Sequence, residues 1–306
     1  MVTRHMQGKV TWVDLESPTR EELDAVMAEF KIDPRIKEEI ICPTPYPLVV
    51  PFEDYVYLIL HFPTADSLLG ARNQEIDIIV GKKFIITARY EVIESIYNLH
   101  KVFEAEELLG VPNSALADTS TLLERIMRRL YGAIREEIEH TAAHLDRIEQ
   151  NIFSGKERDM VGEISRAGRT LLRFETALRR HEEALGVFLG ALCAKEFFGK
   201  GFAAHAAHIA AEREHCASLV SSYRAGATEL RNTNDSLLTA SQNEISKKLT
   251  VLAFAAVPLT IITGMFGMNI DAMPIINEPN GFWIIIGLML LTVLSAIGIF
   301  RLKRWL

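Results

Sequence analysis

The stretch LTVLAFAAVPLTIITGMFGM, Leu249 to Met268, contains no charged side chain and decides the architecture of the chain. Twenty residues with a rise of about 1.5 Å each span roughly 30 Å, which is the thickness of the hydrocarbon core of a bilayer. A second uncharged run, Gly281 to Phe300, follows after the loop Asn269 to Asn280. The sequence therefore predicts a hairpin of two membrane-spanning helices that follows a long polar segment.

Basic residues flank this hairpin on both of its chain ends: Lys247, Lys248, Arg301, Lys303 and Arg304. The connecting loop has no Lys or Arg and carries Asp271 and Glu278. Since Lys and Arg stay on the cytoplasmic side of membrane hairpins, both termini are expected in the cytoplasm. Residues 1–14 lack the apolar core of a signal peptide, so we expect a multi-pass protein of the inner or plasma membrane.

The polar segment is acidic. Residues 1–248 carry 38 acidic and 30 basic side chains, a net charge of −8. This charge argues against a nucleic-acid partner and suits either a surface that attracts cations or ordinary solubility. Cys42, Cys193 and Cys216 show no CxxC spacing, as expected of thiols kept reduced in the cytosol.

The N-terminal part predicts a small sheet with helices packed on it. Lys9 to Leu15 alternates like a half-buried strand, and Ser17 and Pro18 are expected to cap and begin a helix that ends near Phe30. Asp33 to Glu39 predicts a further helical turn. Three β-branched and aromatic runs predict strands: Tyr55–Phe62, Glu75–Val80 and Phe84–Ala88. The fold class is therefore α+β, with an α/β domain in the cytosol.

Long helices follow this domain. Leu116 to Phe153 and Glu157 to Phe198 predict an antiparallel pair, and a third helix from Phe202 to Met268 would be on the order of 100 Å long. A helix of that length implies self-association or a bundle. We divide the chain into the cytosolic domain 1–201, the stalk helix with the first span 202–268, the external loop 269–280, and the second span with its basic tail 281–306.

Small residues recur on one side of the first span. The spacings of seven, four, three, four and three residues place one stripe on the helix: Ser246, Ala253, Val257, Thr260, Gly264 and Gly267. Such a stripe permits close packing of helices. Around a symmetry axis it would instead line a pore, with Thr260 and Asn269 as polar rings. The spacing alone leaves both interpretations open.

Catalytic patterns are absent from the sequence, which has no nucleophile elbow, phosphate-binding loop or paired catalytic carboxylates, so no enzymatic activity is expected. His205, His208 and His215 on the stalk are candidate metal ligands, because a symmetric oligomer would multiply any ligand they supply. The alternative is a solvated helix face.

Several motifs in order resemble the CorA family of magnesium channels. They are NTNDSLL (232–238), QNEISKKLT (242–250), VPLTIITGMFGMN (257–269), the loop pair Met273-Pro274 and the basic end LKRWL (302–306). The N-terminal WVDLESPT, EDYVYLILHFP and EIDIIVGKKFIITAR are also similar to the cytosolic domain of that family.

The resemblance implies a homopentameric channel for Mg²⁺, with Co²⁺ and Ni²⁺ as further candidate ions, whose entry is driven by the membrane potential. Gly267, Met268 and Asn269 would form the selectivity filter at the outer mouth. Asn243, Thr260 and Gly264 would line the path. Intracellular Mg²⁺ between subunits would close it, although no acidic pair here matches the regulatory site of the family.

Two positions depart from the family pattern. Ser246 and Val257 stand where many members have methionine constrictions, so the hydrophobic gate is expected to be wider or shifted, for example to Leu249. The filter chemistry agrees with the resemblance, because Mg²⁺ gives up its water reluctantly and neutral oxygens can bind the hydrated ion without trapping it.

Two alternatives remain. A zinc or other transition-metal transporter of the ZntB type has the same two-span layout but commonly varies the middle residue of the filter motif, so Met268 favours CorA. A membrane-anchored scaffold that conducts no ions would use the stripe only for packing.

Overall fold

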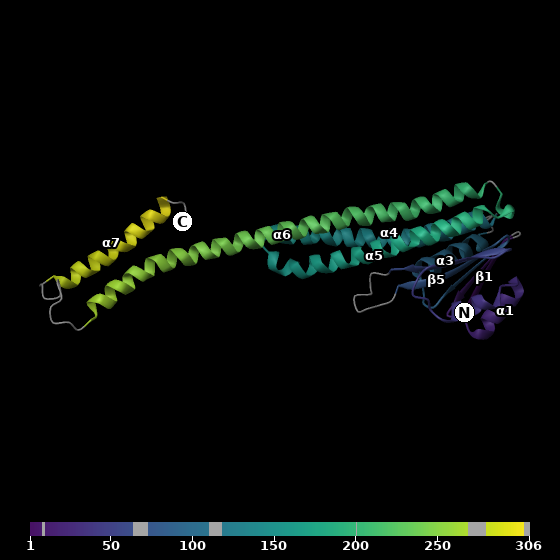
Figure 1. The fold of residues 1–306 in the computed structure, drawn as a ribbon, viewed down its shortest axis with the longest axis horizontal. Coiled ribbons are helices and arrows are strands. Elements are labelled where there is room, and N and C mark those ends of the chain that lie inside the picture. The colour runs from purple at the N-terminus through teal and green to yellow at the C-terminus, as the bar shows by residue number, and fades with distance from the viewer. Residues whose placement is uncertain (8–9, 64–72, 110–117, 200, 269–279, 303–306) are drawn as a thin grey trace. The chain divides into compact units, whose positions relative to one another are not determined.

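The computed structural model describes residues 1–7, 10–63, 73–109, 118–199, 201–268 and 280–302. They form two compact units, Met1–Arg231 and Asn232–Leu306, and the division falls inside one long helix. Figure 1 follows the chain through both units.

A six-stranded mixed sheet organises the first unit, in the order β1-β2-β6-β5-β4-β3. The strands are β1 (Val2–Gln7), β2 (Val10–Glu16), β3 (Leu48–Pro51), β4 (Tyr55–Phe62), β5 (Gln74–Gly81) and β6 (Phe84–Arg89). Only the β2–β6 pair is parallel among these strands. The predicted strands are confirmed as β2, β4, β5 and β6, whereas β1 and β3 were not predicted.

One face of the sheet is covered by α1 (Arg20–Phe30) and α2 (Pro34–Ile41). Because successive side chains of a strand point to opposite faces, Tyr57 and Ile59 of β4 join this core layer. Tyr55 fixes the start of α2, since its hydroxyl accepts the backbone N–H of Asp33 at 2.9 Å.

The other face is covered by longer helices, namely α3 (Glu94–Leu108), α4 (Thr119–Phe153), α5 (Glu157–Cys193) and the first part of α6 (Phe202–Phe266) (Figure 1). Leu58 and Leu60 of β4 belong to this core together with Leu123 and Phe188. Helices on both faces of a mixed sheet confirm the α+β class.

Two predicted helix ends are corrected by the structure. The N-cap of α1 is Thr19, whose hydroxyl accepts the N–H of Glu22 at 3.1 Å while Glu22 accepts the N–H of Thr19 at 3.0 Å. Ser17 is instead left-handed, with φ 41°, and its hydroxyl donates to the carbonyl of Tyr90. Helix α5 ends at Cys193, and Glu196–Phe198 form a separate 3-10 turn.

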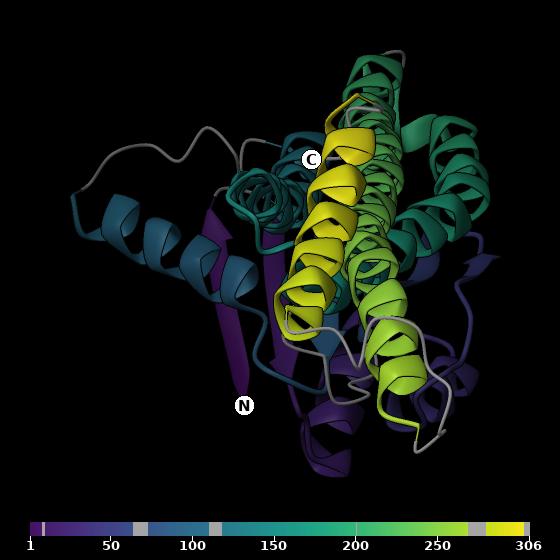
Figure 2. The same cartoon turned by 90° about the vertical axis from the view of Figure 1, so that its left-hand side faces the viewer.

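The second unit contains the end of α6 and α7 (Gly281–Leu302), which runs beside it in the opposite direction (Figures 1 and 2). Both helices are long and apolar enough to cross a membrane. Helix α6 continues through Pro258, whose missing N–H leaves the carbonyl of Phe254 without its usual helical partner. Membrane helices tolerate such a proline, so the first span stays one element.

Candidate functional site

Helix α7 shields one face of the first span. Half-buried residues recur every three or four positions along α6 and so share one face. They are Val251, Ala255, Leu259, Ile262 and Phe266. The matching half-buried or buried positions of α7 are Ile285, Met289, Thr292, Val293, Ala296 and Phe300. The rings of Phe254 and Phe300 lie 6.0 Å apart, centroid to centroid. The two helices therefore contact each other along these faces.

The small-residue stripe lies on the opposite face of α6. With 3.6 residues per turn, Val257, Thr260 and Gly264 are rotated by roughly half a turn from the face next to α7. All members of the stripe are exposed, and Val257 exposes 54% of its surface. This face is therefore available to other copies of the chain.

The structure gives Thr260 a defined hydroxyl orientation. Its Oγ1 donates to the carbonyl oxygen of Ala256 at 3.0 Å, so the hydrogen is used within the helix. The oxygen lone pairs stay on the exposed side, and a hydroxyl with its hydrogen occupied acts only as an acceptor. Acceptors suit a hydrated cation, because the bound waters point their hydrogens outward.

The two stripe glycines differ. A Cβ on Gly264 would meet nothing within 4 Å, whereas a Cβ on Gly267 would lie 2.9 Å from the carbonyl oxygen of Thr263. The Gly267 N–H also donates to this carbonyl at 2.9 Å. The backbone conformation at the end of α6 thus requires glycine at position 267. At position 264 the chain itself leaves room for a side chain, so this glycine can contact another copy.

The predicted filter is only partly within the described residues. Met268 follows the end of α6, is 55% exposed, and donates its N–H to the carbonyl of Met265 at 3.3 Å. Asn269, Asp271 and Glu278 lie outside the described residues. Their roles stay predictions from the sequence.

Below the span, Asn243, Ser246 and Leu249 are exposed on α6. Leu249 exposes 61% of its surface, so an apolar side chain stands at the boundary where the uncharged run begins. Beside them Lys248 bonds to Glu244 at 2.9 Å, and this hydrogen bond lowers the pKa of the Glu244 carboxyl. The ion pair keeps both charges on the surface of the helix.

The structure places two of the three stalk histidines beside one carboxylate. His205 Nδ1 and His208 Nδ1 bond to the two carboxylate oxygens of Glu124, at 2.6 and 3.1 Å, while His215 is exposed elsewhere on α6. Across the described ranges, no group of three or more His, Cys, Asp or Glu is placed to hold a metal ion. The sequence did not indicate Glu124 as the partner, because it lies on α4, far away along the chain.

A comparison with protein families finds a match over residues 7–304 to the model described as CorA-like Mg²⁺ transporter protein. Among curated relatives, the cobalt/magnesium transport protein CorA of Methanocaldococcus jannaschii is 22% identical over 302 residues, covering 97% of this chain and 92% of the relative. The protein of the same name from Thermotoga maritima is 22% identical over 303 residues, covering 97% and 83%.

Solved structures agree on the fold. The complete CorA magnesium transporter from Methanocaldococcus jannaschii superposes with a TM-score of 0.81 at 22% identity, over 99% of this chain and 93% of that one. The ZntB cytoplasmic domain from Vibrio parahaemolyticus gives a TM-score of 0.59 at 13% identity, over 78% and 91%. The likeness to the complete transporter extends through both units of this chain.

Proposed function

This chain belongs to the CorA-like Mg²⁺ transporter family, and from that premise we propose that it forms a homopentameric channel for Mg²⁺ uptake. One observation carries the proposal: the face of α6 that holds Val257, Thr260 and Gly264 is exposed and lies opposite the face next to α7. Five such faces around an axis would line a path, with the second spans outside. The names of two relatives add Co²⁺ as a candidate ion.

The basic residues at both chain ends of the hairpin support cytoplasmic termini and an external loop. With that orientation, a cation enters down the membrane potential. At about 2.3 kcal/mol per charge per 100 mV, a divalent cation gains roughly 4.6 kcal/mol on moving inward. No coupled ion is needed for uptake.

Selection would use neutral oxygens. In this proposal, the Asn269 side chains and the Gly267 carbonyls bind the hydrated ion at the outer mouth, and the acceptor hydroxyls of Thr260 bind it again deeper in the span. Because no fixed charge lines these rings, a divalent ion is not trapped and leaves easily. Asn243 and Ser246 continue the polar path, and Leu249 and Val257 supply its apolar constrictions.

Closure would use intracellular Mg²⁺. The segment 1–248 carries a net charge of −8, so copies gathered around one axis repel one another unless cations bridge them. Bound Mg²⁺ therefore favours a symmetric closed ring, and its loss frees the stalk helices that continue into the pore. This closure is a ligand-biased equilibrium between two states.

Zinc transport is the second candidate, supported by the fold likeness to the ZntB cytoplasmic domain. His205 and His208 are the residues that would serve zinc, and in the structure both bind Glu124. A competition assay with Mg²⁺, Co²⁺, Ni²⁺ and Zn²⁺ separates the two functions. If added Zn²⁺ does not reduce Mg²⁺ uptake, the protein is not a zinc transporter.

Ion flux into liposomes that contain the purified full-length protein tests the proposal. A negative interior potential should drive Mg²⁺ entry, and reversal of the potential should stop it. Liposomes of the same lipid without protein give the leak. Protein that assembles but carries no current above this leak would show a non-conducting scaffold, in which the stripe only packs.

A further inference from the structure

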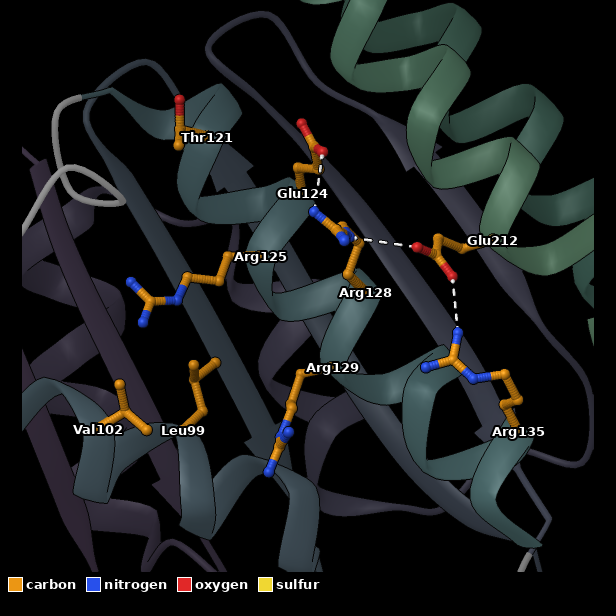
Figure 3. Close-up of a pocket in the computed structure, with 9 residues that line it drawn as sticks. All are labelled: Leu99, Val102, Thr121, Glu124, Arg125, Arg128, Arg129, Arg135 and Glu212. Atoms are coloured by element: carbon orange, nitrogen blue, oxygen red, sulfur yellow. Dashed lines mark hydrogen bonds and ion pairs between the residues drawn. The ribbon is translucent and has the colours of Figure 1, made fainter. Parts of the chain in front are cut away.

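A pocket of about 530 Å³ lies between α3, α4 and α6 in the first unit (Figure 3). Four of its lining residues are arginines of α4, and the full lining is Leu99, Val102, Thr121, Glu124, Arg125, Arg128, Arg129, Arg135 and Glu212. The transport path described above does not use these residues. The arginines recur on one face of α4, and their helical spacing is already visible in the sequence.

One side of the pocket already holds an oxyanion from the chain itself. Figure 3 shows the Glu212 carboxylate between Arg128 and Arg135, with Arg128 Nε 3.2 Å from one carboxylate oxygen and Arg135 Nη1 3.6 Å from the other. Guanidinium groups bind carboxylates and phosphates through the same planar array of N–H donors. The two arginines are therefore placed to bind an anion between α4 and α6.

The other side holds an unused cation. Arg129 is exposed, points away from Glu212 (Figure 3), and makes no hydrogen bond or ion pair with any residue that the structure describes. Arg125, next to it, bonds to Glu106 at 3.0 Å and lies over the ring of Phe103, 4.8 Å from its centroid. Arg129 thus offers its full set of donors to a ligand.

Charge, length and polarity define the class of ligand. Four arginines against two glutamates leave the lining with a charge of +2, within a segment whose net charge is −8. Arg125 and Arg135 are ten positions apart, which is about 15 Å along the helix. Val102 of α3, which is 40% exposed, adds an apolar wall together with the edge of the buried Leu99. A chain of phosphates attached to a flat heterocyclic base, whose ring faces can pack on apolar side chains, satisfies all three conditions.

We propose that this pocket binds a nucleoside polyphosphate, with its phosphates along Arg128, Arg129 and Arg135 and its base against Leu99 and Val102. The ligand competes with Glu212 for Arg128 and Arg135, and Glu212 belongs to the stalk helix α6. Occupancy of the pocket therefore weakens the tie between α4 and α6. This site is separate from the ion path and does not depend on its assignment.

Calorimetric titration of the purified full-length protein with ATP, at fixed free Mg²⁺, tests the proposal. Saturable binding is expected, falling as salt rises. Arg129→Gln should weaken it about tenfold, as expected for the loss of a charge-assisted hydrogen bond. Glu212→Gln should tighten it several-fold because it removes the internal competitor. Arg179→Gln, a matched change on the exposed face of α5, should leave binding unchanged.

Because Arg129 makes no hydrogen bond or ion pair with the residues that the structure describes, its variant should keep the melting temperature of the wild type. No saturable ATP binding in the millimolar range, or equal affinity in Arg129→Gln, would overturn the proposal. Pyrophosphate has no base, so equal affinity for pyrophosphate and ATP would overturn the placement of a base against Leu99 and Val102. Absent nucleotide binding, together with loss of oligomer in Arg129→Glu, would show that a neighbouring copy fills the pocket.

Discussion

The hydroxyl of Thr260 donates its hydrogen to the carbonyl oxygen of Ala256, 3.0 Å away on the same helix. Thr260 consequently presents the acceptor lone pairs of its hydroxyl on the exposed face of α6. A ring of such acceptors can bind the water shell of a cation and cannot donate to an anion. In the proposed pentamer, a cation preference at this depth would follow from this intrahelical hydrogen bond.

Thr260→Val should lower Mg²⁺ flux roughly tenfold, because valine keeps the shape of threonine and removes the acceptor, a loss of about 1.4 kcal/mol. Flux into liposomes measures the effect. Thr292→Val is the matched control: its hydroxyl bonds to the Leu288 carbonyl at 2.6 Å on the face of α7 that contacts α6, so flux should be unchanged. Wild-type flux in Thr260→Val would show that this hydroxyl is only structural.

Asn269→Ala should abolish uptake and leave assembly intact, since the amide oxygen is the proposed outer ligand and its removal leaves no polar side chain at that ring. Growth of a transport-deficient strain at low Mg²⁺ measures uptake, and size-exclusion chromatography measures assembly. Asn277→Ala, in the same loop, is the control. Full growth rescue by the Asn269 variant would remove this residue from the filter.

The two stripe glycines should respond differently to alanine. Gly267→Ala should lower the melting temperature and flux together, because the added Cβ would lie 2.9 Å from the Thr263 carbonyl. Gly264→Ala meets nothing within its own chain. A loss of oligomer in Gly264→Ala would therefore show that this position contacts another copy. A loss of flux in an intact oligomer would show that the added methyl group narrows the path. Equal melting temperatures for the wild type and Gly267→Ala would contradict the close approach seen at the end of α6.

Local pattern was enough for much of this fold. Strand β4 was predicted at its observed bounds because an unbroken run of apolar, aromatic and β-branched residues predicts a buried strand. Strand β1 was missed because Arg4 and His5 interrupt any apolar alternation. His5 is buried by long-range contacts, which include a 2.8 Å hydrogen bond with the distant His100. The cap of α1 was misplaced because Ser17 bonds to Tyr90.

The candidate site was likewise only partly predictable from the sequence. Periodicity alone placed Val257, Thr260 and Gly264 on one stripe, because helical spacing is a local property. The face that α7 covers was not predictable, since two uniformly apolar helices carry little pattern to show which sides meet. The arginine pocket needed the distant Glu212 and the wall of α3 beside α4. Long-range contacts of this kind are what the structure adds.

His181 predicts acid sensitivity of the first unit. It is fully buried; its Nε2–H donates to the carbonyl of His61 at 3.0 Å and its Nδ1 accepts the hydroxyl of Tyr131 at 3.2 Å. Burial lowers its pKa from 6.5 to about 4. The unfolded chain therefore binds the extra proton between these values, so stability is lost as pH falls from 6.5 to about 4, by up to about 3 kcal/mol.

Melting temperatures of the purified protein between pH 7.5 and 4 measure this loss. His181→Gln should flatten the fall, because glutamine can donate to the His61 carbonyl and accept from Tyr131 without titrating. His215→Gln, at an exposed position on α6, should keep the wild-type pH profile. A wild-type profile in His181→Gln would assign the acid sensitivity to other groups.

Cytoplasmic Mg²⁺ should close the channel, and the reason is electrostatic. In the proposed pentamer, five copies of a segment with net charge −8 would bring about forty negative charges around one axis. In the proposed mechanism, bridging cations would offset this repulsion, and without them the first units would separate and move the helix that continues into the span. Protease sensitivity should thus fall as Mg²⁺ rises through the millimolar range, and conductance should fall in parallel. Monovalent salt at matched ionic strength controls for simple screening. Protection and current that both ignore Mg²⁺ on the cytoplasmic side would rule this mechanism out, and the ion path along Thr260 would then need another gate.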